Sequence, residues 1–177
     1  MSKMDTGRPF TNVSELLEQL MNHHHPYTRA ALAELFPLAV KVARAHGDRH
    51  PELAQLVSLL GRLRDDMDMH LMKEENILFP YIRQLAGSLA VAPPPFGTIA
   101  NPIRVMRAEH NTDRTILDQI VTVTHDFTLP PDACTSFSAL YQGVRALVED
   151  IVRHMDLENN HLFPLAIELE ENQLARS

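Results

Sequence analysis

The chain has 177 residues, 45% of them hydrophobic, and a formal net charge of −7 at pH 7, values typical of one domain of about 100–200 residues. An acidic chain without basic runs is a poor candidate for binding nucleic acid. No apolar stretch reaches the roughly 20 residues that cross a bilayer. The polar residues 1–10 lack the apolar core of a secretion signal. The single cysteine, Cys134, excludes an internal disulfide and a cysteine-cluster metal site, so we expect one cytoplasmic domain over residues 1–177 that does not bind membranes.

Clusters of Gly and Pro divide the chain into four long segments. The largest cluster, residues 87–101, contains three consecutive prolines and is predicted to be a connector. Shorter breaks fall at Gly47 and at Pro130-Pro131. In chain order, the segments between these breaks cover about residues 12–46, 51–86, 102–126 and 134–172.

Proline inside a helical pattern predicts that the helices are bent. Proline lacks an N–H, and its ring clashes with the preceding turn, so it kinks or breaks a helix. The prolines in question are Pro26, Pro37, Pro80 and Pro164. The same reasoning allows a short separate helix before His25.

Apolar residues recur at spacings of three and four in the second and fourth segments. The positions are Leu56, Leu60, Leu63, Met67, Ile77 and Tyr81 in the second segment, and Phe137, Leu140, Val144, Leu147, Ile151 and Leu165 in the fourth. This spacing predicts amphipathic helices whose apolar stripe faces a bundle core. No segment alternates in the manner of a strand, so the predicted fold class is all-α.

The two halves of the chain repeat one another. The sequence HLMKEENILFP begins at His70, and HMDLENNHLFP begins 84 residues later at His154. His25 and His110 are 85 residues apart, and apolar residues follow each of them at seven and ten positions. Internal repeats define architecture. The unit here is an αα-hairpin used over about residues 12–86 and again over about 102–172, which predicts an up-down four-helix bundle.

Histidine and glutamate occupy positions where these stripes should face the core. Residues four apart lie on one face of a helix, and a His-x3-Glu pair occurs on the second and on the fourth stripe. Each remaining segment adds one histidine. The complete set is His25, His70, Glu74, His110, His154 and Glu158.

Burying these six side chains requires compensation. Each uncompensated polar group in a core costs roughly 2–7 kcal/mol, so six of them would exceed a net stability of about 5–15 kcal/mol. Two cations would compensate them, because imidazole is a neutral nitrogen donor and each glutamate can bridge both ions. Nitrogen and oxygen donors without thiolate argue against an iron–sulfur cluster. A non-haem di-iron centre fits best, and the ligand types also allow manganese or zinc.

Other histidines have competing interpretations. A lone histidine on an apolar face is most often a hydrogen-bonded core residue, and we expect this of His161, although it could also orient a ligand. His23 and His24 adjoin His25, and helix phase alone does not choose among these three.

Carboxylates beside the candidate ligands are possible partners for the second imidazole nitrogen. Asp66 and Asp150 each precede a predicted ligand by four residues, and Glu109 precedes His110. A solvated charge is the commoner role for each of the three. Cys134 is expected to be an incidental thiol without a histidine partner.

These motifs resemble the hemerythrin-like (HHE cation-binding) family, most closely its repair-of-iron-centres branch. The resemblance covers about residues 16–170 and is carried by HHPY from His24, the two eleven-residue repeats, Glu109-His110 and DIVRH from Asp150. It implies that the iron ligands are His25, His70, Glu74, His110, His154 and Glu158. It also implies that both glutamates, with an oxo or hydroxo group, bridge two Fe ions.

The sequence departs from the family in two respects. Oxygen-carrying hemerythrins have a further histidine four residues after the third-helix ligand, where this chain has Arg114. Fewer protein ligands favour reaction with a small molecule, or iron exchange, over a closed oxygen carrier. Longer members of the repair branch also begin with a small domain containing a Cys pair. This chain starts close to its first predicted helix, so we expect it to lack steps that depend on those thiols.

The resemblance leads us to expect a di-iron protein of the nitrosative and oxidative stress response. It would react with NO or oxygen species, or donate iron to damaged clusters in iron–sulfur proteins. The alternatives are a reversible O2 or NO carrier or sensor without turnover, and a structural bundle whose metal only neutralises buried charge. No substrate pocket can be identified from the motifs, so enzyme activity stays open, and either a monomer or a homodimer is compatible with the sequence.

Overall fold

The computed structural model describes residues 12–87 and 93–175, and all regular secondary structure in these ranges is helical. Three short π-helical turns, labelled η, interrupt the α-helices. The elements in chain order are α1 (Val13–Gln19), η1 (Leu20–His24), α2 (His25–His46), α3 (Glu52–Lys73), η2 (Glu74–Leu78), α4 (Phe79–Ala86), α5 (Ala100–Val123), α6 (Thr135–Leu157), η3 (Glu158–Leu162) and α7 (Phe163–Leu174).

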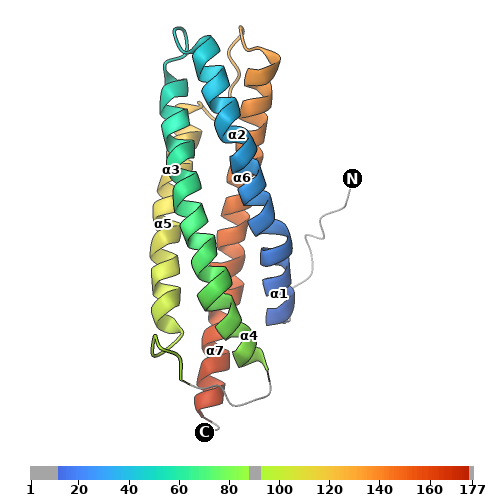
Figure 1. The fold of residues 1–177 in the computed structure, drawn as a ribbon, viewed down its shortest axis with the longest axis vertical. Helices are drawn as coiled ribbons and strands as arrows, with labels where there is room; N and C mark the ends of the chain where they lie inside the picture. Colours follow the sequence, from blue (N-terminus) through green and yellow to red (C-terminus); the bar gives the residue numbers. More distant parts are fainter. Residues whose placement is uncertain (1–11, 88–92, 176–177) are drawn as a thin grey trace.

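Four long helical stretches run side by side along the long axis of the molecule (Figure 1). Helix α2 packs against α3 and α6, and α5 completes the bundle by packing against α3 and α6. Helices that follow one another in the chain are therefore neighbours, as short antiparallel connections require. The predicted all-α bundle is confirmed. The N-terminal α1 is not a separate helix, because η1 joins it to α2 without a break.

The core has two parts. One hydrophobic cluster fills the bundle between α2, α3, α5 and α6 and includes Leu60, Val144 and Phe137. The other lies where α1, α4 and α7 meet and includes Leu16 and Phe163. Full burial of each such side chain contributes roughly 1.5–3 kcal/mol. Five of the six predicted ligands lie where α-helices meet π turns, and the sixth, His110, lies within α5.

The π turns explain where the predicted stripes fail. Each turn ends two residues before a proline, at His24, Leu78 or Leu162. A proline ring clashes with the carbonyl four residues earlier in an α-helix, and a wider turn accommodates it. Each π turn inserts one extra residue, so Leu78 and Leu162 face the core while Ile77 is half exposed.

Two predictions at these turns were wrong for this reason. Ile77 was placed on the core stripe and is exposed. His161 was expected in the core and is also exposed, because it occupies the position in η3 that Ile77 occupies in η2.

A buried carboxylate, that of Glu170, forms hydrogen bonds with the C-terminal end of the connector. Glu170 accepts hydrogen bonds from the Tyr81 hydroxyl at 2.8 Å, from the Thr98 hydroxyl, and from the Ile99 backbone N–H at 3.0 Å. Burial, together with this carboxylate, raises the pKa of Tyr81 to about 12. Ile99 itself is completely buried, and Phe96 packs against the cluster that contains Leu16 and Phe163.

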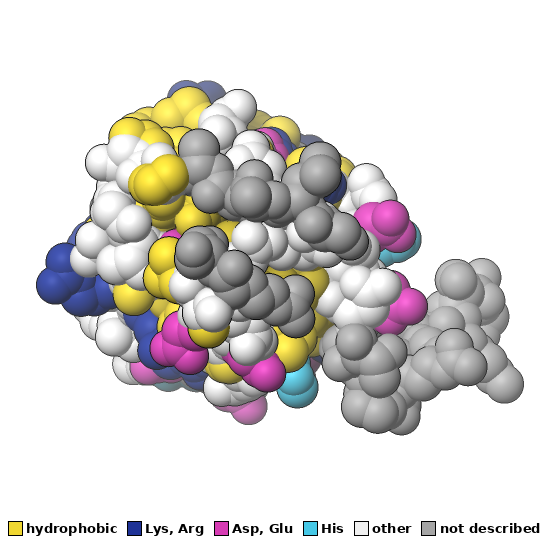
Figure 2. Space-filling view, turned by 90° about the horizontal axis from the view of Figure 1, so that it is seen from below, with side chains coloured by type: hydrophobic (Ala, Val, Ile, Leu, Met, Phe, Trp, Pro, Cys, Tyr) yellow, Lys and Arg dark blue, Asp and Glu magenta, His cyan; other side chains and the backbone are white. Residues whose placement is uncertain are grey.

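The end of the molecule at which α4 and α7 finish shows hydrophobic side chains between charged ones (Figure 2). Leu174, at the end of α7, is 70% exposed. Among the described helices, none combines the length and the hydropathy that a membrane span requires.

Replacing Glu170 with Ala should destabilise the bundle, because three donors lose one buried, charged acceptor. We expect a loss of about 2–4 kcal/mol in the free energy of unfolding. Thermal denaturation followed by circular dichroism measures this loss, and Glu168→Ala on the exposed face of α7 is the matched control. Equal melting temperatures for the two variants would contradict the role assigned to Glu170.

Candidate metal centre

The structure brings all six predicted ligands together inside the bundle. His25 begins α2, and His110 lies in the first half of α5. The remaining four come from two equivalent junctions, α3–η2 and α6–η3, where a histidine lies in the last turn of the α-helix and a glutamate begins the π turn. None of the six is more than 2% exposed.

The six side chains form two groups of four that share both glutamates. One group contains His25 and His154, the other contains His70 and His110, and each also contains Glu74 and Glu158. Within each group the donor atoms all lie within 4.8 Å of one another. We call these groups the His25/His154 position and the His70/His110 position.

Each glutamate divides its two oxygens between the positions. Glu74 Oε1 lies 3.3 Å from His70 Nε2, while its Oε2 lies 3.5 Å from His25 Nε2. Glu158 does the same in the other half: Oε1 is 3.0 Å from His154 Nε2, and Oε2 is 3.2 Å from His110 Nε2. All four histidines thus present the Nε2 atom to the carboxylates. This is the arrangement expected of two carboxylates that bridge a pair of ions.

Several atoms of this cluster that could bind a metal are buried and have no hydrogen-bond partner in the part of the chain that the structure describes. They are His25 Nε2, both carboxylate oxygens of Glu74 and Oε2 of Glu158. Buried polar groups are almost always satisfied, so these atoms are what an ion in each position would bind. Neutral nitrogen and carboxylate oxygen donors suit first-row transition metals, and the residues therefore fit a two-metal centre.

Electrostatics within the cluster are strong. Burial alone raises the pKa of Glu158, but His154 and His110 outweigh it and hold that pKa well below its usual range. Burial lowers the pKa of His70, yet Glu74 and Glu109 raise it well above 6.5. The buried carboxylates of Glu74 and Glu158 are thus stabilised by nearby positive charge, which protons on the imidazoles or metal ions can supply.

Carboxylates orient two of the imidazoles from outside. Glu75 Oε1 lies 2.8 Å from His25 Nδ1, and Arg29 holds Glu75 through two bonds of 2.7 and 3.1 Å. Glu109 Oε2 lies 3.0 Å from His70 Nδ1 and is paired with Lys73. The bond to His70, with Lys73, lowers the pKa of Glu109 to about 2 against the effect of burial. Such partners fix ring orientation and raise the basicity of a ligand.

The remaining two imidazoles, those of His110 and His154, differ in the surroundings of their Nδ1 atoms. His110 Nδ1 lies 3.2 Å from the Asn159 side-chain oxygen. His154 Nδ1 is buried and has no hydrogen-bond partner among the described residues. His24 stacks on the His154 ring with centroids 5.8 Å apart, but its own Nδ1 faces Asp150 at 3.0 Å.

The structure distinguishes between the alternatives that the sequence left open for the first histidine and for Glu109. His25, not exposed His23 or Asp150-bound His24, joins the cluster. Glu109 contacts His70 directly, so the prediction that it is only a solvated charge was wrong.

The other two carboxylates that the sequence offered as partners, Asp66 and Asp150, do not contact a predicted ligand. Asp150 contacts His24 and not His154. Asp66 pairs with Arg62 on the exposed side of α3.

Sequence reasoning missed Glu75 and Asn159. Each directly follows a predicted glutamate ligand, and the two are equivalent in the repeat. That position relative to the repeated His-x3-Glu motif was the signal available in the sequence.

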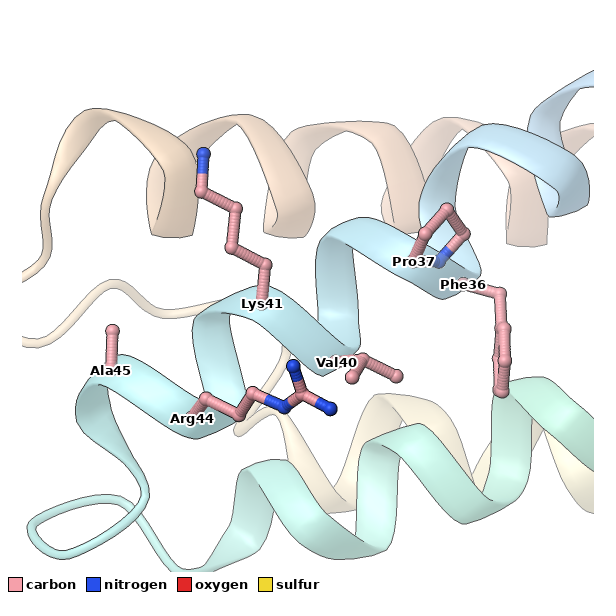
Figure 3. Close-up of a pocket in the computed structure, with 6 residues that line it drawn as sticks. All are labelled: Phe36, Pro37, Val40, Lys41, Arg44 and Ala45. Atoms are coloured by element: carbon pink, nitrogen blue, oxygen red, sulfur yellow. The ribbon is translucent and has the colours of Figure 1, made fainter.

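Two features away from the cluster differ from it in chemistry. A groove of about 630 Å³ along α2 is lined by Phe36, Pro37, Val40, Lys41, Arg44 and Ala45 (Figure 3), without carboxylate or imidazole. At the last residue of α2, His46 Nε2 lies 3.2 Å from Cys134 Sγ. The expectation that Cys134 lacks a histidine partner was therefore wrong.

Comparison with known proteins agrees with this geometry. Residues 16–166 match the family described as "Hemerythrin HHE cation binding domain". The chain belongs to this family.

Relatives of this hemerythrin HHE chain include a protein of Cronobacter sakazakii named "Iron-sulfur cluster repair protein YtfE", which is 38% identical over 155 residues. Proteins of the same name from Escherichia coli O1:K1 and Escherichia fergusonii are 37% identical over 155 residues. In each case the match covers 88% of this chain and 66% of the relative. The chain thus spans about two thirds of the length of these relatives.

The residue that distinguishes this hemerythrin HHE chain from the oxygen-carrier pattern lies outside the cluster. Arg114 pairs with Asp156 at 3.0 Å, and both side chains are about half exposed. Position 114 therefore contributes no donor to either group of four.

Metal binding should release protons, because the raised pKa of His70 keeps a proton on the imidazole that a metal must displace. For each proton released, lowering the pH by one unit should weaken the apparent affinity about tenfold. Anaerobic titration with Fe²⁺ in weak buffer containing a pH indicator measures both effects. A His161→Gln variant, altered on the exposed side of η3, should behave as the unmodified chain. Uptake that is independent of pH and releases no proton would contradict this electrostatic picture.

Proposed function

We propose that this chain holds two iron ions between its six buried ligands and acts in the repair of iron–sulfur clusters under nitrosative or oxidative stress. The observation that supports this most strongly is the division of each glutamate between two pairs of imidazoles. Paired carboxylates and histidines in a helical bundle form the di-iron sites of other bundle proteins. The name of the relatives supports the repair role.

The chain's own residues would hold, orient and protect the ions. Each position offers two imidazole nitrogens and two carboxylate oxygens, so an ion that prefers six donors retains places for exchangeable ligands. The surrounding side chains exclude bulk water, since every ligand is at most 2% exposed. When bound, the iron pair would supply one-electron chemistry and coordination sites for a diatomic molecule such as NO or O2.

Binding of a gas without turnover is the second candidate, supported by the same free coordination places. The optical spectrum separates the two. A stable O2 adduct that disappears on degassing favours a carrier or sensor, whereas rapid oxidation to an inert di-ferric form favours the reactive repair protein.

Loss of either shared glutamate should remove at least one of the two metal ions. Glu74→Leu and Glu158→Leu are each expected to lose about one or both irons per chain, because each glutamate contacts both pairs of imidazoles. Metal analysis of the purified variants measures this, with Glu149→Leu on the exposed side of α6 as control. Two tightly bound irons in both glutamate variants would overturn the ligand assignment.

The repair role has a cellular test. In bacteria deleted for the gene and exposed to NO, the unmodified chain should restore the activity of an iron–sulfur enzyme such as aconitase faster than Glu74→Leu does. Recovery at equal rates with and without the unmodified chain would contradict the proposed role while leaving metal binding intact.

A further inference from the structure

We infer that the two metal positions are unequal, and that the His25/His154 position is the one that exchanges its ion. This inference rests on the proposed function and identifies which half of the centre would release iron. It is carried by the hydrogen bonds that the four imidazoles make on the side away from the glutamates.

A histidine that binds metal through Nε2 carries a hydrogen on Nδ1. All four imidazoles of the cluster present Nε2 to the glutamates, so all four need an acceptor at Nδ1. Losing such an acceptor typically weakens metal binding 10- to 100-fold, because the ring is less firmly oriented and less basic.

Three of the four imidazoles have an acceptor. At the His70/His110 position, a carboxylate oxygen lies 3.0 Å from one Nδ1 and an amide oxygen lies 3.2 Å from the other. At the His25/His154 position, Glu75 Oε1 lies 2.8 Å from His25 Nδ1, while His154 Nδ1 is buried and has no hydrogen-bond partner within residues 12–87 and 93–175. The imidazole that lacks an Nδ1 acceptor therefore belongs to the His25/His154 position.

The internal repeat shows why His154 Nδ1 lacks an acceptor while the equivalent His70 Nδ1 has one. His25 and His110 are equivalent with an offset of 85 residues, so His24 occupies the place that Glu109 holds in the second half. Glu109 accepts from His70, but an imidazole at residue 24 stacks on His154 and turns its Nδ1 to Asp150 instead. Substitution of a carboxylate by an imidazole at this one position makes the two halves differ.

Within the His25/His154 position, the two shared glutamates lie at unequal distances from His154. Glu74 Oε2 lies 3.9 Å from His154 Nε2, compared with 3.5 Å from His25 Nε2. Glu158 Oε1, in contrast, lies 3.0 Å from His154 Nε2, so His154 is close to only one of the two shared carboxylates. An ion beside His154 is the one we expect to leave first.

The test follows the release of iron from the full chain. The protein is loaded anaerobically with two Fe²⁺ per chain and challenged with excess chromophoric chelator. We expect two phases of one iron each, with rates that differ at least tenfold. In His24→Gln the amide oxygen can accept from His154 in the way that Asn159 accepts from His110, so the fast phase should slow about tenfold and the slow phase should not change.

His24→Leu is the matched control. It removes the contact with Asp150 and supplies no acceptor, so its fast phase should stay as fast as that of the unmodified chain. Glu109→Leu removes the acceptor of His70 and should instead accelerate the slow phase. Equal melting temperatures of the metal-free variants would show that packing is preserved.

The outcomes separate this inference from the proposed function. Release of two irons in a single phase, or identical kinetics of His24→Gln and His24→Leu, would overturn the inequality and leave the di-iron proposal intact. Failure of the unmodified chain to take up two irons would overturn both.

Discussion

Two buried glutamates that face four imidazoles are the constraint on which the rest of this structure depends. Glu74 and Glu158 are completely buried, and three of their four oxygens have no hydrogen-bond partner among the residues that the structure describes. In a core of low polarity, such carboxylates are tolerable only when positive charge lies close to them. Protons on the imidazoles can supply that charge, and two metal ions supply it more completely while also fixing the rings.

The fold places these groups by interrupting its helices. In each repeat an α-helix ends after a histidine, a π turn begins at a glutamate, and a proline follows the turn. The wider turn shifts the apolar stripe by one residue, so the leucine before Phe79 or Phe163 closes the core behind the glutamate. π turns are frequent at functional sites. Here they let one helix present polar ligands and then return to hydrophobic packing.

The sequence was sufficient to predict the bundle and to select six residues that the structure brings together, because apolar periodicity and a repeated motif both depend on local spacing. It was insufficient wherever the outcome depended on register or on contacts between helices. A π turn changes which residue faces inward, which is why His161 was misplaced. The partners of the imidazoles lie on other helices, so Glu75 and Asn159 were overlooked, as was the contact between His46 and Cys134. That the six residues bind metal, and that the metal is iron, stay predictions.

Anomalous X-ray diffraction from crystals grown with Fe²⁺, recorded on both sides of the iron absorption edge, tests the central claim most directly. We predict two iron peaks inside the bundle, one between His25 and His154 and one between His70 and His110, each contacted by both glutamates. Ordered crystals of iron-treated protein that show no iron between these side chains, or a peak at only one of the two positions under saturating iron, would contradict that claim.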